Sequence, residues 1–195
     1  MDIVISLLIT FVLIVVNGYF SMAEMALSTA KKALLERASA EGDVRGAIAV
    51  DAVENPDGYL AAIQVAITLV GFASSVTAAT NLSTPVAQLF ASWGMSLSFA
   101  HAIAPALITL VISYISIVIG ELVPKRMALS DAERIAMAVA GPLLHFSTLA
   151  RPLVWLTSAS AEGIAHLLHL KNASDRQLIS EDEIKYLVKD NQELS

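Results

Sequence analysis

Long apolar stretches alternate with short charged ones along this chain of 195 residues. No Asp, Glu, Lys or Arg occurs in residues 3–23, and none occurs in residues 58–120. About 20 apolar residues let an α-helix cross a bilayer, so the first stretch can hold one span and the second can hold two joined by a loop. The pattern predicts an all-α membrane protein whose three transmembrane helices cover residues 3–29, 59–79 and 99–123.

Composition and charge narrow the class of protein further. Hydrophobic residues make up 56% of the chain and charged residues 15%, against about 25% charged in a typical soluble domain. The net charge is −6 and no basic patch occurs in a soluble module, which argues against a nucleic-acid partner. The absence of cysteine excludes disulfides, thiolate metal sites and cysteine catalysis.

Basic residues set the expected orientation in the bilayer. They follow the first span and the third span, whereas residues 80–98 between the second and third spans contain no Lys or Arg; the basic residues are Lys31, Lys32, Arg37 and Arg45, then Lys125, Arg126 and Arg134. The positive-inside rule therefore predicts a multi-pass cell-membrane protein with its N-terminus outside and its C-terminus in the cytoplasm.

The segments that follow the first and third spans are expected on the cytoplasmic side. Residues 31–58 are expected to form helix and turn, and the turn sequence at residues 55–58 starts the second span. Residues 135–159 are apolar enough to suggest a fourth span, but Gly141-Pro142 and Arg151-Pro152 interrupt them. We therefore expect the transmembrane region to end near residue 134, followed by an amphipathic helical hairpin or belt lying at the membrane face.

The last segment, residues 171–195, is polar and acidic. Ser180-Glu181-Asp182-Glu183 is a capping-box sequence that predicts a helix reaching about Lys189. Because no closing element follows, we expect this segment to be a linker toward a further cytoplasmic domain beyond the chain.

Each predicted span carries one stripe of polar and small residues. Their spacing of i, i+4, i+7 and i+11 places them on one face of a helix with 3.6 residues per turn. The stripes are Asn17, Ser21, Glu24 and Ser28; then Gln64, Thr68, Gly71 and Ser75; then Thr109, Ser113, Ser116 and Gly120. Such faces either line a polar site or allow close helix packing through small residues.

The carboxylates of Glu24 and Glu121 favour the polar site, because an acidic residue inside a membrane is costly and by default marks a functional site. Pro124 has no N–H, so it leaves the carbonyl of Gly120 free beside Glu121. A free carbonyl, a carboxylate and facing side-chain oxygens form a site for a hard cation. In the alternative reading, Pro124 ends the helix at the interface, Glu121 is solvated, Lys125 snorkels and Glu24 caps a packing network.

Oxygen ligands suit Mg²⁺, Ca²⁺ or Na⁺ and disfavour zinc or copper. His166 and His169 have a spacing that can hold a metal, but their cytoplasmic amphipathic stretch favours a surface role instead. An intramembrane hydrolase would need a positioned base, and no span places a histidine beside a serine, so no enzyme activity is expected.

Two segments carry a family resemblance. Residues 17–28, Asn-Gly-Tyr-Phe-Ser-Met-Ala-Glu-Met-Ala-Leu-Ser, resemble the first-helix signature of the CorC/cyclin-M family of magnesium transporters. Residues 119–125, Ile-Gly-Glu-Leu-Val-Pro-Lys, resemble its third-helix motif. The resemblance implies three membrane helices per subunit, a homodimer, and Mg²⁺ export coupled to Na⁺. It also implies a C-terminal pair of CBS domains that binds ATP and lies beyond this chain.

The same resemblance assigns the ion-binding positions to Asn17, Ser21, Gly120 and Glu121, and the stripe spacing adds Ser75. Secondary candidates lie next to these positions on the same faces, and Pro124 supports the site by breaking the helix; the candidates are Glu24, Ser28, Ser74 and Ser116. The hypothesis is a transporter membrane domain that binds Mg²⁺ as its substrate. The alternative is a membrane-anchored Mg²⁺ sensor that carries no bulk flux.

Overall fold

The computed structural model describes residues 3–168, which form helices joined by short turns and contain no strand. The elements are α1 (Ile3–Thr29), α2 (Lys32–Ala40), α3 (Val44–Glu54), α4 (Pro56–Ser92), α5 (Leu97–Ile117), the π-helical turn η1 (Val118–Leu122), α6 (Val123–Ser130) and α7 (Ala132–Leu167). The predicted all-α class is confirmed. The predicted linker, residues 171–195, and His169 lie outside the described residues.

The chain divides into two compact units, Met1–Val154 and Trp155–Ser195. In the second unit the structure describes residues 155–168, which complete α7. The first unit holds the three helices that are long and apolar enough to cross a membrane: α1, α4 and the stretch Leu97–Ser130 that runs through α5, η1 and α6.

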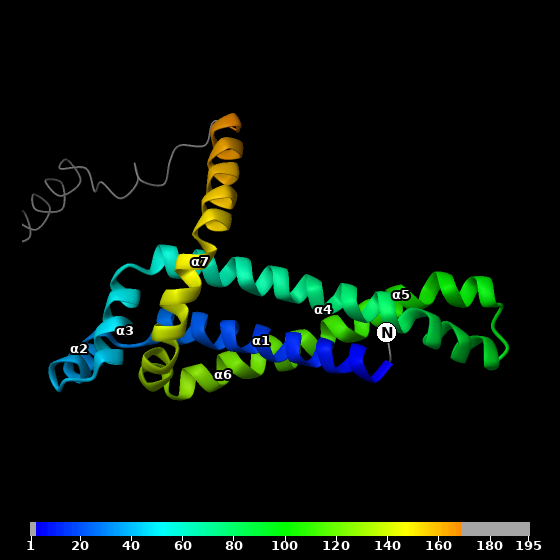
Figure 1. Cartoon of the computed structure of the whole chain (residues 1–195), viewed down its shortest axis with the longest axis horizontal. Helices are drawn as coiled ribbons and strands as arrows, with labels where there is room; N and C mark the ends of the chain where they lie inside the picture. The colour runs from blue at the N-terminus through cyan, green and yellow to red at the C-terminus, as the bar shows by residue number, and fades with distance from the viewer. Residues whose placement is uncertain (1–2, 169–195) are drawn as a thin grey trace, which may run out of the picture. The chain divides into compact units, whose positions relative to one another are not determined.

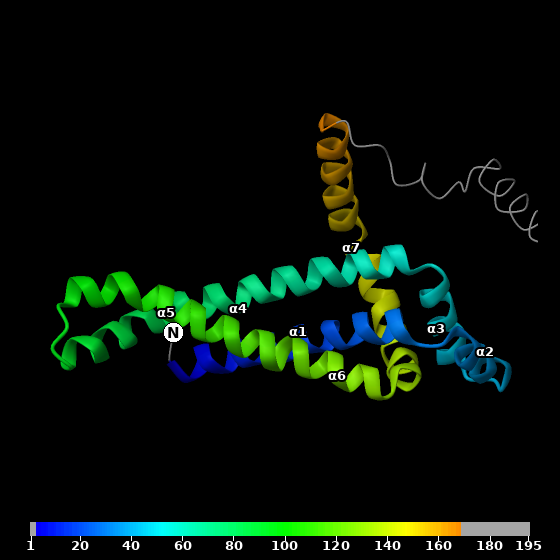
Figure 2. The same ribbon diagram turned by 180° about the vertical axis from the view of Figure 1, so that it is seen from behind.

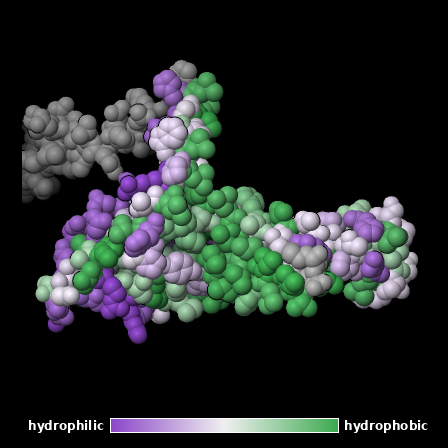
Figure 3. Space-filling model, viewed as in Figure 1, coloured by the Kyte–Doolittle hydropathy of each residue, from purple (hydrophilic) through white to green (hydrophobic). Residues whose placement is uncertain are grey.

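Within the first unit, α4 packs against α1 and α5, and α1 packs against η1 and α6, as Figures 1 and 2 show from opposite sides. Hydrophobic residues form a continuous band over the middle of these helices, and hydrophilic residues gather at the end that carries α2 and α3 (Figure 3). A chain whose three long helices expose such a band is a multi-pass membrane protein.

The second membrane helix is longer than the sequence predicted. It begins at Pro56, within the predicted turn at residues 55–58, and it continues past residue 79 to Ser92. Its final turns pack through Ala87 against Ala100 and Ala104 of α5, all three fully buried. These small side chains let two helices approach closely, so the predicted connector over residues 80–98 is reduced to a turn around Gly94, whose φ is +94°.

The predicted interruption at Gly141-Pro142 is wrong, since α7 continues through both prolines. Its first turns bury Ala136, Val139, Ala140 and Leu143 in the hydrophobic core that also contains Phe20 of α1. These positions recur at helical spacing, and burying them offsets the hydrogen bond that Pro142 cannot donate.

The segment between α1 and α4 folds as the predicted helices. Asp43 caps α3 by accepting a hydrogen bond from the Arg45 N–H at 2.9 Å. The Arg45 guanidinium also bonds this carboxylate and holds the pKa of Asp43 below its usual range. Gly46 lets α3 contact α2, because a Cβ there would lie 2.8 Å from the Ser39 nitrogen.

Candidate cation site

The third membrane helix changes its hydrogen-bonding pattern where the sequence places Gly120 and Glu121. Over η1 the backbone widens to a π-helical turn, and the Val123 N–H donates to the Val118 carbonyl five residues earlier. Pro124 has no N–H to donate to Gly120, so the regular bond cannot form there. The helix nevertheless continues through Pro124 to Ser130, which contradicts the reading of Pro124 as the helix end. Such single π turns occur frequently at functional sites.

The Gly120 carbonyl is paired across the helix contact instead. The Asn17 amide donates from Nδ2 to this oxygen at 3.0 Å, and Asn17 is only 4% exposed. The two backbones meet at glycines: a Cβ on Gly120 would lie 3.1 Å from the Ile14 carbonyl oxygen, and one on Gly18 would lie 3.0 Å from Pro124 Cγ. Glycine at both positions therefore allows α1 to dock against η1, and the docking orients Asn17.

A cavity of about 300 Å³ lies beside this contact. It is lined from all three membrane helices, and its polar lining residues are Asn17 of α1, Thr68 and Ser75 of α4, Ser113 and Ser116 of α5 and Glu121 of η1. The three polar stripes predicted from the sequence thus converge on one space. Its polar lining therefore offers neutral oxygens and one carboxylate, beside the apolar side chains of Ile67, Phe72 and Ile117.

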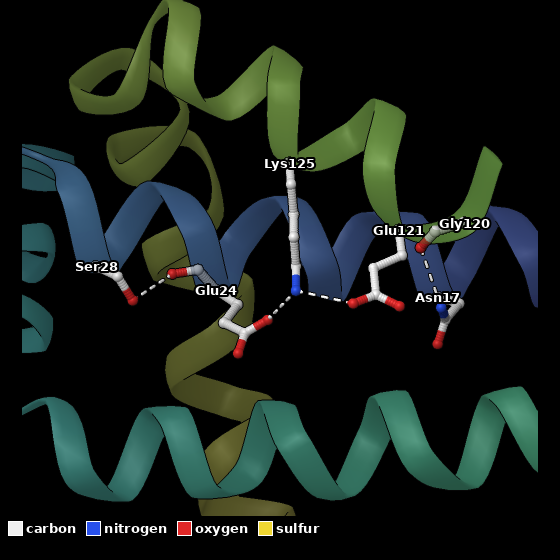
Figure 4. Close-up of polar contacts among 6 residues, drawn as sticks. All are labelled: Asn17, Glu24, Ser28, Gly120, Glu121 and Lys125. Atoms are coloured by element: carbon white, nitrogen blue, oxygen red, sulfur yellow. Dashed lines mark hydrogen bonds and ion pairs between the residues drawn. The ribbon is translucent and has the colours of Figure 1, made fainter. Parts of the chain in front are cut away.

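Some buried side-chain oxygens on α1 and α4 have no hydrogen-bond partner in the described part of the chain. They are Asn17 Oδ1, Ser21 Oγ and Ser74 Oγ, all on side chains at least nine-tenths buried. Figure 4 shows the Asn17 side-chain oxygen pointing away from Gly120, whose carbonyl accepts the hydrogen bond from the amide nitrogen. Buried polar atoms normally pair, because leaving one unpaired costs free energy. Of these residues Asn17 also lines the cavity, and its side-chain oxygen is of the kind that binds a hard cation.

A lysine and two glutamates continue the polar row toward the α2–α3 end (Figure 4). Lys125 Nζ lies 3.0 Å from Glu121 Oε1 and 3.1 Å from Glu24 Oε2. Ser28 Oγ donates to the backbone carbonyl of Glu24 at 2.8 Å rather than to its carboxylate. Lys125 therefore bridges the carboxylates of two helices.

The structure brings together part of the predicted site. Asn17, Ser75, Ser116 and Glu121 line the cavity, and the Gly120 carbonyl adjoins it through Asn17. The other candidates do not line the cavity: Ser21 and Ser74 are buried with unpaired oxygens, and Glu24 and Ser28 lie outside the lining. Thr68 and Ser113 do line the cavity, although the sequence identified them only as members of the polar stripes. Within residues 3–168 no three His, Asp or Glu residues cluster as a metal centre, so the cavity relies mainly on neutral oxygens.

The bridging role of Lys125 is the feature that sequence reasoning missed. The signal was present, because Lys125 lies four residues after Glu121 and such pairs are neighbours on a helix surface. The contact to Glu24 could not be predicted, since it depends on how α1 crosses α6.

Comparison with known proteins identifies the family. A profile of the CNNM family, described as the cyclin M transmembrane N-terminal domain, matches residues 8–194. A UPF0053 protein of Synechocystis is 33% identical over 179 residues, which cover 91% of this chain and 40% of that protein. The UPF0053 protein YhdT of Bacillus subtilis is 31% identical over 189 residues, which cover 96% of this chain and 41% of that protein.

A more distant relative has a functional name. The polyamine export protein of Haemophilus influenzae is 26% identical over 175 residues, which cover 87% of this chain and 39% of that protein. The chain spans about two fifths of the length of these three curated relatives. The profile covers nearly the whole chain and includes both segments that suggested the family, so the chain belongs to the cyclin M transmembrane N-terminal domain family.

Proposed function

We propose that this chain is the membrane domain of a cation transporter, and that it binds Mg²⁺ as substrate in the cavity between α1, α4 and α5–η1. One observation carries the proposal. The Asn17 side chain donates a hydrogen bond from its amide nitrogen to the Gly120 carbonyl, and the buried amide oxygen of Asn17 has no partner. Asn17 and Glu121 line the same cavity. Family membership and the export function named for one relative support a role in transport.

The chemistry of the lining fits a hard cation. Mg²⁺ prefers oxygen ligands and gives up its waters reluctantly, so it usually keeps several of them and takes one or two carboxylates. A cavity of about 300 Å³ has room for a cation with several waters. Glu121 would supply the negative charge, and Asn17 and Ser75 would supply neutral oxygens. One carboxylate gives moderate affinity, which suits a carrier that must release its ion.

A polyamine is the second candidate substrate, favoured by one specific contact. The Glu24 and Glu121 carboxylates both bond the Lys125 ammonium, so this pair can hold a primary alkylammonium group. A relative of this chain is named a polyamine export protein. Mg²⁺ remains the first candidate, because the unpaired side-chain oxygen of Asn17 belongs to a residue that lines the cavity, and such an oxygen is a ligand for a hard metal ion.

Flux separates these functions. The purified chain in liposomes loaded with a Mg²⁺-sensitive dye should move Mg²⁺ down its gradient, faster with an opposing Na⁺ gradient if Na⁺ is the coupling ion. Radiolabelled spermidine is tested in parallel, with Glu121→Gln as the inactive control. Spermidine uptake without Mg²⁺ flux would mean that the substrate is a polyamine and not Mg²⁺. Mg²⁺ binding without flux would favour the membrane-anchored sensor. A homodimer, and regulation by an ATP-binding CBS pair in a longer protein, belong to the same proposal.

The proposed orientation places the turn between α4 and α5 outside and α2 in the cytoplasm. The chain has no cysteine, so single cysteines report accessibility without background. We expect Ser98→Cys, at the exposed start of α5, to react with a membrane-impermeant maleimide on intact cells. Ala40→Cys, at the exposed end of α2, should react only after permeabilisation. The reverse labelling pattern would invert the topology.

A further inference from the structure

The Glu24–Lys125–Glu121 row contains a cation that belongs to the protein itself. The Lys125 side chain is 24% exposed, and its ammonium contacts both carboxylates at close to 3 Å. Glu121 lines the cavity, whereas Glu24 and Lys125 do not. One end of this row is therefore part of the proposed substrate site and the other end lies outside it.

We propose that Lys125 is a tethered competitor: its ammonium neutralises Glu121 while the cavity is empty, and it passes to Glu24 alone when a divalent cation binds. This inference rests on the proposed function, because it concerns the same cavity.

Charge is the first reason. Two carboxylates and one ammonium give the row a net charge of −1, and the carboxylates are 30% and 38% exposed. Like charges repel more strongly in this partly buried setting than in water, so an ammonium bonded to Glu121 opposes a divalent cation at that carboxylate. The ammonium must leave Glu121 for the cation to receive the full carboxylate charge.

Geometry supplies the second reason. Lys125 and Glu121 lie on one continuous helix, four residues apart, whereas Glu24 reaches the ammonium from α1 across the helix contact. Because the ammonium already contacts Glu24, it can leave Glu121 by rotating its terminal torsions, with no change of backbone. The Glu24 carboxylate is available for this role, since Ser28 bonds the backbone oxygen of Glu24 instead.

The arrangement has a use in transport. A competitor that occupies the ligand for about 90% of the time raises the apparent dissociation constant about tenfold. It also returns to Glu121 as the cation departs, so release does not leave an unpaired, partly buried carboxylate. Lys125 would therefore lower affinity in exchange for faster release, and Glu24 would act as its holding position.

The test is a set of Mg²⁺ titrations by calorimetry on the purified chain. We expect Lys125→Met, an uncharged side chain of similar length, to bind Mg²⁺ about tenfold or more tightly. Lys125→Gln should show the same direction and replaces it if the methionine variant does not fold. Glu24→Gln should weaken binding about threefold in the wild-type background and have no effect beside Lys125→Met.

Lys32→Met is the matched control. Lys32 also bridges two carboxylates, Glu54 at 2.6 Å and Glu36 at 3.4 Å, but it lies outside the cavity lining. Its replacement should leave the Mg²⁺ affinity unchanged.

Each of the remaining outcomes overturns a stated part of the account. Unchanged or weaker binding in Lys125→Met and Lys125→Gln overturns the competitor. An equal effect of Glu24→Gln in both backgrounds overturns the handover, because Glu24 would then act on the ion directly. If Glu121→Gln abolishes binding while the Lys125 variants match the wild type, the proposed function stands and only this inference is overturned. No saturable binding to the wild type removes both.

Discussion

Glu121→Gln is expected to weaken Mg²⁺ binding by at least about a hundredfold, or roughly 2.8 kcal/mol. Among the described residues that line the cavity, Glu121 is the only one with a carboxylate. The amide keeps the shape of the side chain but removes its negative charge and directs an N–H₂ group toward the site. A calorimetric titration of both proteins, with Na⁺ and Ca²⁺ as competitors, measures the loss.

The control for this variant is Glu36→Gln, an exposed carboxylate that pairs with Lys32 outside the cavity lining. It should bind Mg²⁺ like the wild type. Glu121→Gln should elute from size exclusion as the wild type does, because the Asn17–Gly120 contact does not involve its carboxylate. A folded Glu121→Gln variant with unchanged affinity would contradict the ligand assignment.

Gly120→Leu is expected to destabilise the fold by about 3 kcal/mol, the upper part of the usual range for overpacking a tight contact. Even a Cβ at this position would lie 3.1 Å from the Ile14 carbonyl oxygen and 3.4 Å from Asn17 Nδ2. The leucine must separate α1 from η1, which also breaks the Asn17–Gly120 hydrogen bond and disorganises the cavity. The shift is measured as the midpoint of unfolding in mixed detergent, followed by helical circular dichroism.

Gly58→Leu is the matched control, since a Cβ there meets nothing within 4 Å and the position is exposed near the start of α4. We expect its unfolding free energy to stay within about 0.5 kcal/mol of the wild type. A Gly120→Leu protein as stable as this control would mean that the close approach of α1 and η1 does not hold the site together.

The sequence predicted those parts of the fold that depend on local patterns of apolar, polar and turn-forming residues. Uncharged stretches locate the three membrane helices, and the Asn55-Pro56 turn locates the start of α4. The stripe spacing also predicted which faces converge, because helical period alone places Ser75 and Ser116 on the polar sides of their helices. Pro124 indicated a freed carbonyl at Gly120, and the structure pairs that carbonyl with Asn17.

What the sequence did not predict depends on contacts between distant segments. The second span was expected to end near residue 79, but alanine packing against α5 keeps α4 helical to Ser92. Gly141-Pro142 suggested a break, and the buried face of α7 overrides it. The Glu24–Lys125 contact likewise follows from the crossing of α1 and α6, which no local pattern encodes.

The most direct measurement is to locate the ion. Mn²⁺ shares the oxygen preference of Mg²⁺ and scatters anomalously, so crystals of the chain grown with Mn²⁺ report its position. We expect one strong anomalous peak per chain in the cavity, within coordination distance of the Glu121 carboxylate and the Asn17 side-chain oxygen, and its loss on competition with excess Mg²⁺. A peak elsewhere, or an empty cavity at saturating Mn²⁺, would contradict a cation site between the three membrane helices.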